Sequence, residues 1–299
     1  MTKVLTSCLA WLWFLFASGQ EGTMPVAAAF VWQEEHAGDG LDFIRYLLSR
    51  GDNNEALFLL EELPGSTPER NDSVAFLKGW ALYGQKILGP SAAALLDVSE
   101  KSPLYIRSRF FAAYNLAHTG DIRRARGIVA AMNGLPEGME PAMKNFQLGG
   151  MALLARDHDA FATHAASFSG RYHAFATQEA RLQVHHQSLL ALPARSPLVA
   201  GVLSAAVPGL GKIYAGKTGE GIAAFIYTMA FGFTAYDFYR GAGPQSALFI
   251  VSAGIASVFY AGNIWGSAVA VNRKKYERNH ELDQRILFDL HIPLRNAFN

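Results

Sequence analysis

The sequence predicts an all-α protein, in which a helical-hairpin repeat domain is followed by a helical membrane module of two to three spans. Residues 41–192 have the pattern of helices separated by short polar breaks, and they contain no run of alternating β-branched residues that would indicate a sheet. Long uncharged segments begin after Arg195. Only 17% of the residues are charged while 51% are hydrophobic, which favours some membrane-embedded length.

Residues 1–29 are predicted to be a signal peptide. Lys3 is the only charge before the uncharged run 4–18, and three alanines at 27–29 offer a cleavage site. An uncleaved signal anchor is the alternative, because the polar stretch before the alanines is long. Cys8 is the only cysteine and lies in this segment, so a cleaved protein could form no disulfide.

The predicted helical domain, residues 30–195, has a period close to 34 residues. Aligning the first residue that packs after each polar break gives Ala56, Ser91, Ala125 and Ala160, at steps of 35, 34 and 35 residues. Two helices per unit and a constant period are typical of stacked helical hairpins. An ordinary bundle of helices with similar lengths is the alternative.

This pattern resembles tetratricopeptide repeats over about 130 residues. The small, apolar and helix-ending positions of that family correspond in the second repeat to Gly79, Leu82, Leu95, Val98 and Pro103, and in the third to Ala113, Leu116, Ala125 and Val129. The resemblance implies a partner-binding groove on the concave face formed by the first helices of the pairs. The repeat register places Tyr83, Arg107, Tyr114 and Asn145 in that groove.

The predicted membrane module comprises residues 196–272, with uncharged segments at 196–211, 221–236 and 241–272. A spanning helix needs about 20 apolar residues, with about 17 as the lower limit. The last segment is long enough, and the middle one is when Phe238 and Tyr239 are included. The first is marginal, so it either spans the membrane or re-enters it.

The charges of the loops predict the topology, because short cytoplasmic loops favour Lys and Arg. Three spans after an exported domain place Lys212 and Lys217 in a cytoplasmic turn, together with the tail that begins at Arg273. The expected location is therefore the inner membrane of a bacterium, with residues 30–195 in the periplasm and the basic tail, residues 273–299, in the cytoplasm.

A glycine-rich motif connects the first two apolar segments. Its residues are Ser204, Pro208, Gly209, Gly211, Tyr214, Gly216 and Gly221. They resemble the signature S-x-x-x-P-G-x-G-x-x-Y-x-G-x-x-x-x-G of small bacterial membrane domains, a resemblance that implies a membrane location and no particular activity. Gly262 and Gly266 are spaced to let helices approach closely, either within the chain or in a homo-oligomer. The alternative is that glycine is simply common in spanning helices.

The same stretch matches the phosphate-binding P-loop pattern, as Gly211-x-x-x-x-Gly216-Lys217-Thr218. That pattern binds phosphate only between a strand and a helix. The residues before it are rich in Ala and Gly and include two prolines, and most of those after it are lipid-like. Nucleotide binding is therefore not expected.

Other kinds of site are not predicted either. A net charge of +1 gives no reason to expect nucleic acid. The sequence lacks a G-x-S-x-G elbow and an HExxH motif. Adjacent His185 and His186 point about 100° apart on a helix and are predicted to be solvated. We expect no catalytic residues, no metal and no cofactor.

The tail, residues 273–299, places Leu282, Ile286 and Leu290 at four-residue steps. It is predicted to be an amphipathic helix that lies on the membrane, on a partner or on the protein itself.

The predicted function is that of a non-catalytic adaptor or scaffold, which presents the helical domain to protein partners in the bacterial envelope. The alternative is an accessory component of membrane-protein insertion or transport that acts through the membrane module.

Overall fold

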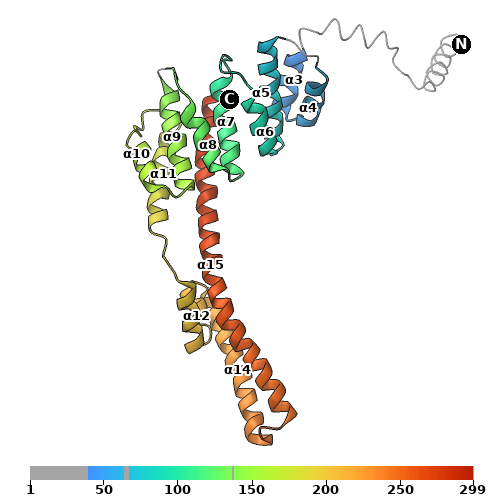
Figure 1. The fold of residues 1–299 in the computed structure, drawn as a ribbon, viewed down its shortest axis with the longest axis vertical. Coiled ribbons are helices and arrows are strands. Elements are labelled where there is room, and N and C mark those ends of the chain that lie inside the picture. Colours follow the sequence, from blue (N-terminus) through green and yellow to red (C-terminus); the bar gives the residue numbers. More distant parts are fainter. Residues whose placement is uncertain (1–39, 64–66, 137, 299) are drawn as a thin grey trace, which may run out of the picture. The chain divides into compact units, whose positions relative to one another are not determined.

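The computed structural model describes residues 40–298 except 64–66 and 137. The predicted signal peptide, residues 1–29, lies outside this range. The described residues form thirteen helices and no strands (Figure 1). The predicted all-α class is therefore confirmed.

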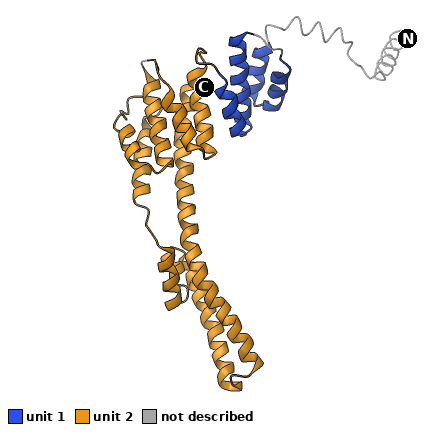
Figure 2. Cartoon of the chain, viewed as in Figure 1, with its two compact units in different colours: residues 1–98 blue, residues 99–299 orange. Residues whose placement is uncertain are grey.

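The chain divides into two compact units, with the boundary between Val98 and Ser99 (Figure 2). The first unit contains α3 (Gly40–Arg50), α4 (Asn53–Glu62), α5 (Pro68–Gly84) and α6 (Leu88–Leu96). Helices α3 and α4 form one hairpin, α5 and α6 form the next, and α4 packs on α5. The core of this unit includes Ile44, Phe76 and Leu95.

The hairpin α5/α6 is closed by small residues. A Cβ atom at Gly79 would lie 2.6 Å from Cγ of Leu95, so the two helices approach closely only because this side chain is absent. Ser91 is fully buried, and its Oγ donates a hydrogen bond to the carbonyl oxygen of Gly79 at 2.6 Å. Ala56 and Ala125, the predicted equivalents of Ser91, are also fully buried, whereas Ala160 is half-buried.

The second unit begins with α7 (Tyr105–His118), α8 (Ile122–Ala131), α9 (Met139–Leu154), α10 (His158–Ala165) and α11 (Ala176–Leu190). Helices α7 and α8 form a hairpin, as do α9 and α10, and α8 packs on α9. The rings of Phe110, Phe111, Phe146 and Phe175 are fully buried in this part of the chain.

All four hairpins turn with the same backbone geometry. The first helix of each hairpin is followed, within two residues, by a residue with positive φ. These residues are Gly51, Lys86, Gly120 and Arg156, with φ of 85°, 63°, 94° and 61°. The N–H of the next residue donates to the carbonyl five residues before it, at 2.9 to 3.0 Å. This is the hydrogen bond that commonly closes a helix C-terminus. The turns follow one another at steps of 35, 34 and 36 residues.

The second unit continues with α12 (Pro197–Ala206), α13 (Leu210–Tyr214), α14 (Thr218–Ala242) and α15 (Ala247–Phe298). Helices α14 and α15 pair side by side, and α12 and α13 pack against α15 (Figure 1). Helix α15 has 52 residues, which at 1.5 Å per residue is a length of ~78 Å. Its first part contacts α12 and α14, while its last part contacts α7, α9 and α11.

We expect Gly79→Ala to destabilise the first unit, because the added methyl group would overlap Leu95 in a packed core. The loss should be roughly 1–3 kcal/mol in the free energy of unfolding. The measurement is urea unfolding of the full chain in detergent, followed by circular dichroism.

The matched control is Gly127→Ala on α8, where an added Cβ meets no atom within 4 Å. This change should stabilise the helix by about 0.5–1 kcal/mol. Equal effects of the two substitutions would show that α5 and α6 do not approach each other at Gly79.

Candidate functional site

The glycine-rich motif forms a compact turn that joins α12, α13 and α14. Ser204 lies at its centre, where its Oγ accepts a hydrogen bond from the N–H of Gly211 at 2.9 Å and lies 2.7 Å from Oγ of Ser267 on α15. Ser267 donates its own hydroxyl hydrogen to the carbonyl of Asn263 at 2.8 Å. Ser204 is therefore the donor of the pair, and its hydroxyl group links the turn to α15.

Three glycines of the motif occupy places where two backbone segments touch. A Cβ at Gly211 would overlap the carbonyl of Ala200 on α12. Gly209, with φ of 85°, lies against the carbonyl of Gly221, and a Cβ at Gly221 would be 2.7 Å from the carbonyl oxygen of Gly209. Any side chain at these positions would force the helices apart.

The remaining motif residues hold the start of α12 against the end of α13. The hydroxyl of Tyr214 accepts a hydrogen bond from the N–H of Ser196 at 3.2 Å. The guanidinium of Arg195 lies over the ring of Tyr214, at 5.9 Å from its centroid. Gly216 has φ of 87° and faces that guanidinium, while Pro208 is buried in the turn. The seven predicted motif residues therefore come together in one packed structure.

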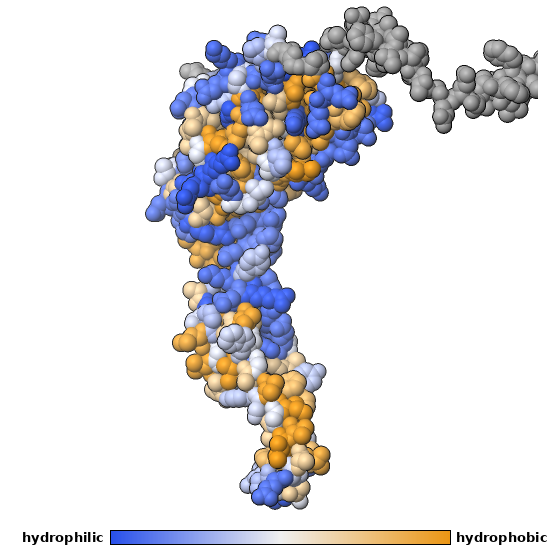
Figure 3. Space-filling view, turned by 45° about the vertical axis from the view of Figure 1, so that its right-hand side comes forward, coloured by the Kyte–Doolittle hydropathy of each residue, from blue (hydrophilic) through white to orange (hydrophobic). Residues whose placement is uncertain are grey.

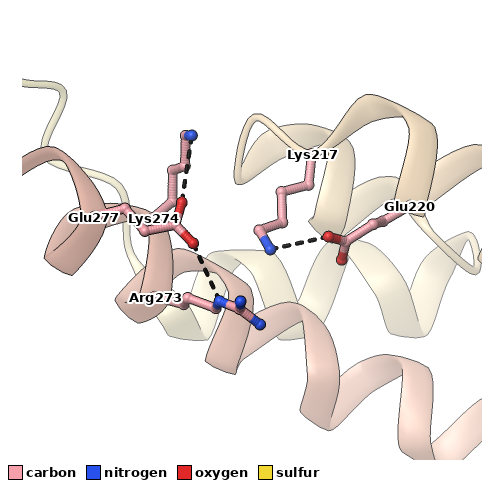
Figure 4. Close-up of polar contacts among 5 residues, drawn as sticks. All are labelled: Lys217, Glu220, Arg273, Lys274 and Glu277. Carbon is pink, nitrogen blue, oxygen red and sulfur yellow. Dashed lines mark hydrogen bonds and ion pairs between the residues drawn. The ribbon is translucent and has the colours of Figure 1, made fainter. Parts of the chain in front are cut away.

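The P-loop match has a different setting from that of a nucleotide-binding loop. Helix α12 precedes it where a P-loop would have a strand. The N–H of Gly211 is engaged by Ser204. Lys217 forms an ion pair with Glu220 at 2.9 Å, as Figure 4 shows beside the contacts that Glu277 accepts from Arg273 and Lys274. This segment is a turn that connects helices, in which no strand precedes the glycines.

Among the described residues, the predicted helix-packing glycines make no close backbone contact with another helix. A Cβ at Gly262 would meet no described atom within 4 Å, and one at Gly266 would meet only Cε of Lys212, at 3.7 Å. The contact between α15 and the motif uses Ser267 and the buried Asn263 instead.

The second arrangement is the packing of residues 283–298, the C-terminal part of α15, on α7, α9 and α11. We call this contact the seat of α15. Leu290 fits against Gly150 on α9, where a Cβ would overlap the leucine side chain. The amide Nε2 of Gln147 donates to the carbonyl oxygen of Leu290 at 2.9 Å. Ile286 and Leu294 are fully buried on the same side of α15.

Charged groups fix the register of this seat. Asp289 is almost completely buried, and its two oxygens accept from Arg181 at 3.1 Å and contact Nε2 of His185 at 2.8 Å. Arg156 forms an ion pair with Asp283 at 2.6 Å. The buried carboxylate of Asp289 needs these partners, because removing the partner of a buried charge is strongly destabilising. The prediction that His185 is solvated was wrong, because Asp289 of α15 covers it.

The predicted groove residues are placed in different surroundings. Tyr114 on α7 stacks on the imidazole of His291, with 4.9 Å between the ring centroids. Arg107 on α7 and Asn145 on α9 are half-buried. Tyr83 belongs to α5 in the other unit, where it packs on Trp80 at 5.4 Å. Tyr114 contacts α15 through this stacking.

The tail packs on the helical domain. Residues 283–298 touch α7, α9 and α11. The charge of residues 273–275 gave no indication of this contact, because local charge does not record which surface the following turns cover. The location of the domain in the periplasm and of the tail in the cytoplasm stays a prediction.

Several residues of this seat were not predicted from the sequence. Gln147, Arg181 and Asp289 carry no local signal, since their partners are more than 100 residues away along the chain. The pair Gly149-Gly150 inside a helix was the one available signal, because glycine there often marks a close approach. Among the residues that the structure describes, no group of three His, Cys, Asp or Glu side chains is placed to hold a metal ion.

No family model, curated protein or solved structure matches this chain. The resemblances to tetratricopeptide repeats and to the small membrane domains therefore stay predictions.

We expect Gly211→Ala to lower the thermal unfolding midpoint of the detergent-solubilised protein, because the new methyl group would overlap the carbonyl of Ala200. The free energy of unfolding should fall by roughly 1–3 kcal/mol. Gly219→Ala is the matched control, since a Cβ there meets no atom within 4 Å. A midpoint unchanged in both variants would contradict the described turn.

The seat of α15 should weaken in acid. Burial lowers the pKa of His291 below its ordinary 6.5, and the charges of Arg295 and His118 lower it further. A released tail therefore binds a proton below pH 6.5 that the seated tail does not, so seating is strongest above that pH and weakens as the pH falls through 6.5. Hydrogen exchange of residues 283–298 should accelerate accordingly.

His291→Phe keeps an aromatic ring against Tyr114 and should flatten this pH dependence. His173→Phe, at an exposed position of the same unit, should leave it unchanged. An unaltered pH profile in His291→Phe would assign the acid sensitivity to another group.

Proposed function

We propose that this chain is a membrane-anchored, non-catalytic scaffold of the bacterial envelope, which holds a tetratricopeptide-like helical domain at a fixed position beside the bilayer. One observation carries the proposal. Helix α15 is continuous from an apolar, outward-facing segment to a segment that is seated on α7, α9 and α11. A single helix therefore belongs to both the anchor and the domain.

The apolar surface of α14 and α15 supports a membrane location. Figure 3 shows hydrophobic side chains gathered over this end of the second unit. Helix α15 is the one described helix that is both long and apolar enough to cross a membrane, and only 11% of its apolar window is buried within the chain. A core helix of a soluble protein would bury most of such a surface. The exposed residues include Ile222, Phe225, Ile226, Phe233, Leu248, Ile250, Val251, Ile255, Val258 and Trp265.

Helix α15 alone meets both the length and the hydropathy expected of a span, and we propose α14 as a second crossing from its length and its exposed apolar residues, with α12 as a re-entrant segment. Helix α14 has 25 residues, or ~37 Å, which is longer than the ~30 Å hydrocarbon core. Helix α12 has 10 residues, or ~15 Å, which is too short to cross. With α14 and α15 as the two spans, the connection at 243–246 lies on the side of the membrane opposite to the helical domain.

We assign the helical domain and the tail to the periplasmic side. The predicted signal at residues 1–29 directs export, and long domains translocate largely regardless of their charge. The basic residues at the domain end of the two spans favour the opposite orientation under the rule for short loops. The location of residues 243–246 distinguishes the two orientations.

The four equivalent turns support a repeat architecture for the helical domain, because the same positive-φ residue and hydrogen bond recur at nearly constant spacing. The face of α7, α9 and α11 is covered by α15, so we place the protein-binding surface on the first unit. Phe43, Tyr46 and Phe58 are 51%, 52% and 60% exposed on α3 and α4. Exposed aromatic side chains are enriched where proteins bind one another.

We test the proposal with single cysteines in a Cys8→Ser background, at Asn133, Gln245 and Asn296, all of which are exposed. In intact cells with a permeabilised outer membrane, an impermeant maleimide should label Asn133→Cys and Asn296→Cys but not Gln245→Cys. Labelling of Gln245→Cys alone would reverse the orientation. Labelling of only one of the other two would place the tail and the domain on opposite sides, and recovery of the chain in the soluble fraction would overturn the anchor.

A further inference from the structure

A basic pocket lies where the connection 192–196 passes α15, directly beyond the apolar part of that helix. Its volume is about 350 Å³, which is within the range of roughly 300–1,000 Å³ for small-ligand sites. We propose that it binds the phosphate of an anionic lipid headgroup. This inference rests on the membrane location proposed above and goes beyond it by assigning a ligand class.

All charged side chains that line the pocket are basic. On α15, Val271, Lys274, Lys275 and Arg278 line it, and their spacing of three, four and seven residues places them on one face of the helix. Arg195 lines it from the connection 192–196, and no acidic side chain is among the lining residues. Lys274 is paired with Glu277 at 3.4 Å. Within the described chain, Lys275, Arg278 and Arg195 form no ion pair.

Arg195 is held in place without an anion. Its guanidinium lies over the ring of Tyr214, and its Nη1 atom is buried and has no hydrogen-bond partner in the described structure. A Cβ at Gly216 would lie 2.6 Å from that nitrogen, so the glycine of the motif leaves the space that the guanidinium occupies. Arg195 as a whole is half-buried and lines the pocket, and phosphate oxygens are the acceptors that its guanidinium fork matches best.

The position of the pocket relative to the proposed bilayer favours a lipid as the source of the phosphate. The uncharged run of α15 ends at Asn272 and the basic residues begin at Arg273, so the pocket lies level with the headgroups when the preceding part of α15 spans the bilayer. The lining also includes Leu192, Ala215 and Val271, apolar surface that can contact the first carbons of an acyl chain. A free phosphate would make no use of that surface.

Native mass spectrometry of the full-length chain in mild detergent tests the assignment, with added phosphatidylglycerol, phosphatidylcholine or inorganic phosphate as probes. The wild type should retain phosphatidylglycerol in preference to phosphatidylcholine. Arg195→Gln should weaken that binding about fivefold, and the triple variant Arg195→Gln, Lys275→Gln, Arg278→Gln roughly a hundredfold, since each charge near the headgroups contributes about the same factor.

The matched control removes three exposed basic residues elsewhere, as Lys101→Gln, Arg123→Gln, Arg124→Gln, and should retain the lipid like the wild type. Equal retention in the pocket triple variant would overturn the site, as would equal binding of the two lipids. Displacement of the lipid by inorganic phosphate would overturn the lipid assignment. Membrane fractionation of the same cells tests the anchor separately, because a chain that sediments with membranes but lacks lipid preference refutes only the pocket.

Discussion

The structure of the second unit depends on the seat of α15 around Leu290 and Asp289. Leu290 enters the space left by Gly150, and full burial of a leucine or isoleucine side chain contributes about 1.5–3 kcal/mol. Ile286 and Leu294 add to this apolar contact. The buried Asp289 accepts from two side chains of α11, which selects one register of α15, because shifting the helix by a residue would leave a charge buried without partners.

Helix α15 is uninterrupted between its apolar segment and the seat. The stretch between the apolar segment and the seat carries ion pairs along the helix, from Arg273 to Glu277 at 3.1 Å and from Arg285 to Glu281 at 2.6 Å. Solvent-exposed pairs of this kind add little to the stability of the fold. They favour an uninterrupted helix, so that the apolar part of α15 and its contacts with α7, α9 and α11 belong to one continuous element of the second unit. At the apolar part of the same helix, the glycine-rich turn packs α12 and α13 against α15, with Ser204 hydrogen-bonded to Ser267.

Local patterns in the sequence predicted the fold class and the turns, because helix periodicity, small packing residues and turn glycines are encoded within a few residues of one another. Ala56, Ser91 and Ala125 are buried as their spacing indicates. The glycine motif was predicted as a unit, although its geometry was not. The seat of α15 was not predicted, since Gln147 and Leu290 are 143 residues apart and a stripe of apolar residues does not identify what covers it. The charged residues after Asn272 also predicted a boundary between the membrane module and the tail, whereas the structure has one continuous helix, α15, across that position.

Disulfide trapping between Gly150→Cys and Leu290→Cys in native membranes, with Cys8→Ser, tests the seat of α15 most directly. The Cβ position at Gly150 lies 2.8 Å from Cγ of Leu290, the atom that the sulfur of a cysteine at position 290 would replace. We expect the bond to form in the full chain and to be detected by mass spectrometry. Phe288 lies two residues away on the exposed side of α15, so Gly150→Cys with Phe288→Cys should not form it. No bond at 290, or equal yields at 288 and 290, would show that α15 is not seated on α9 in the membrane.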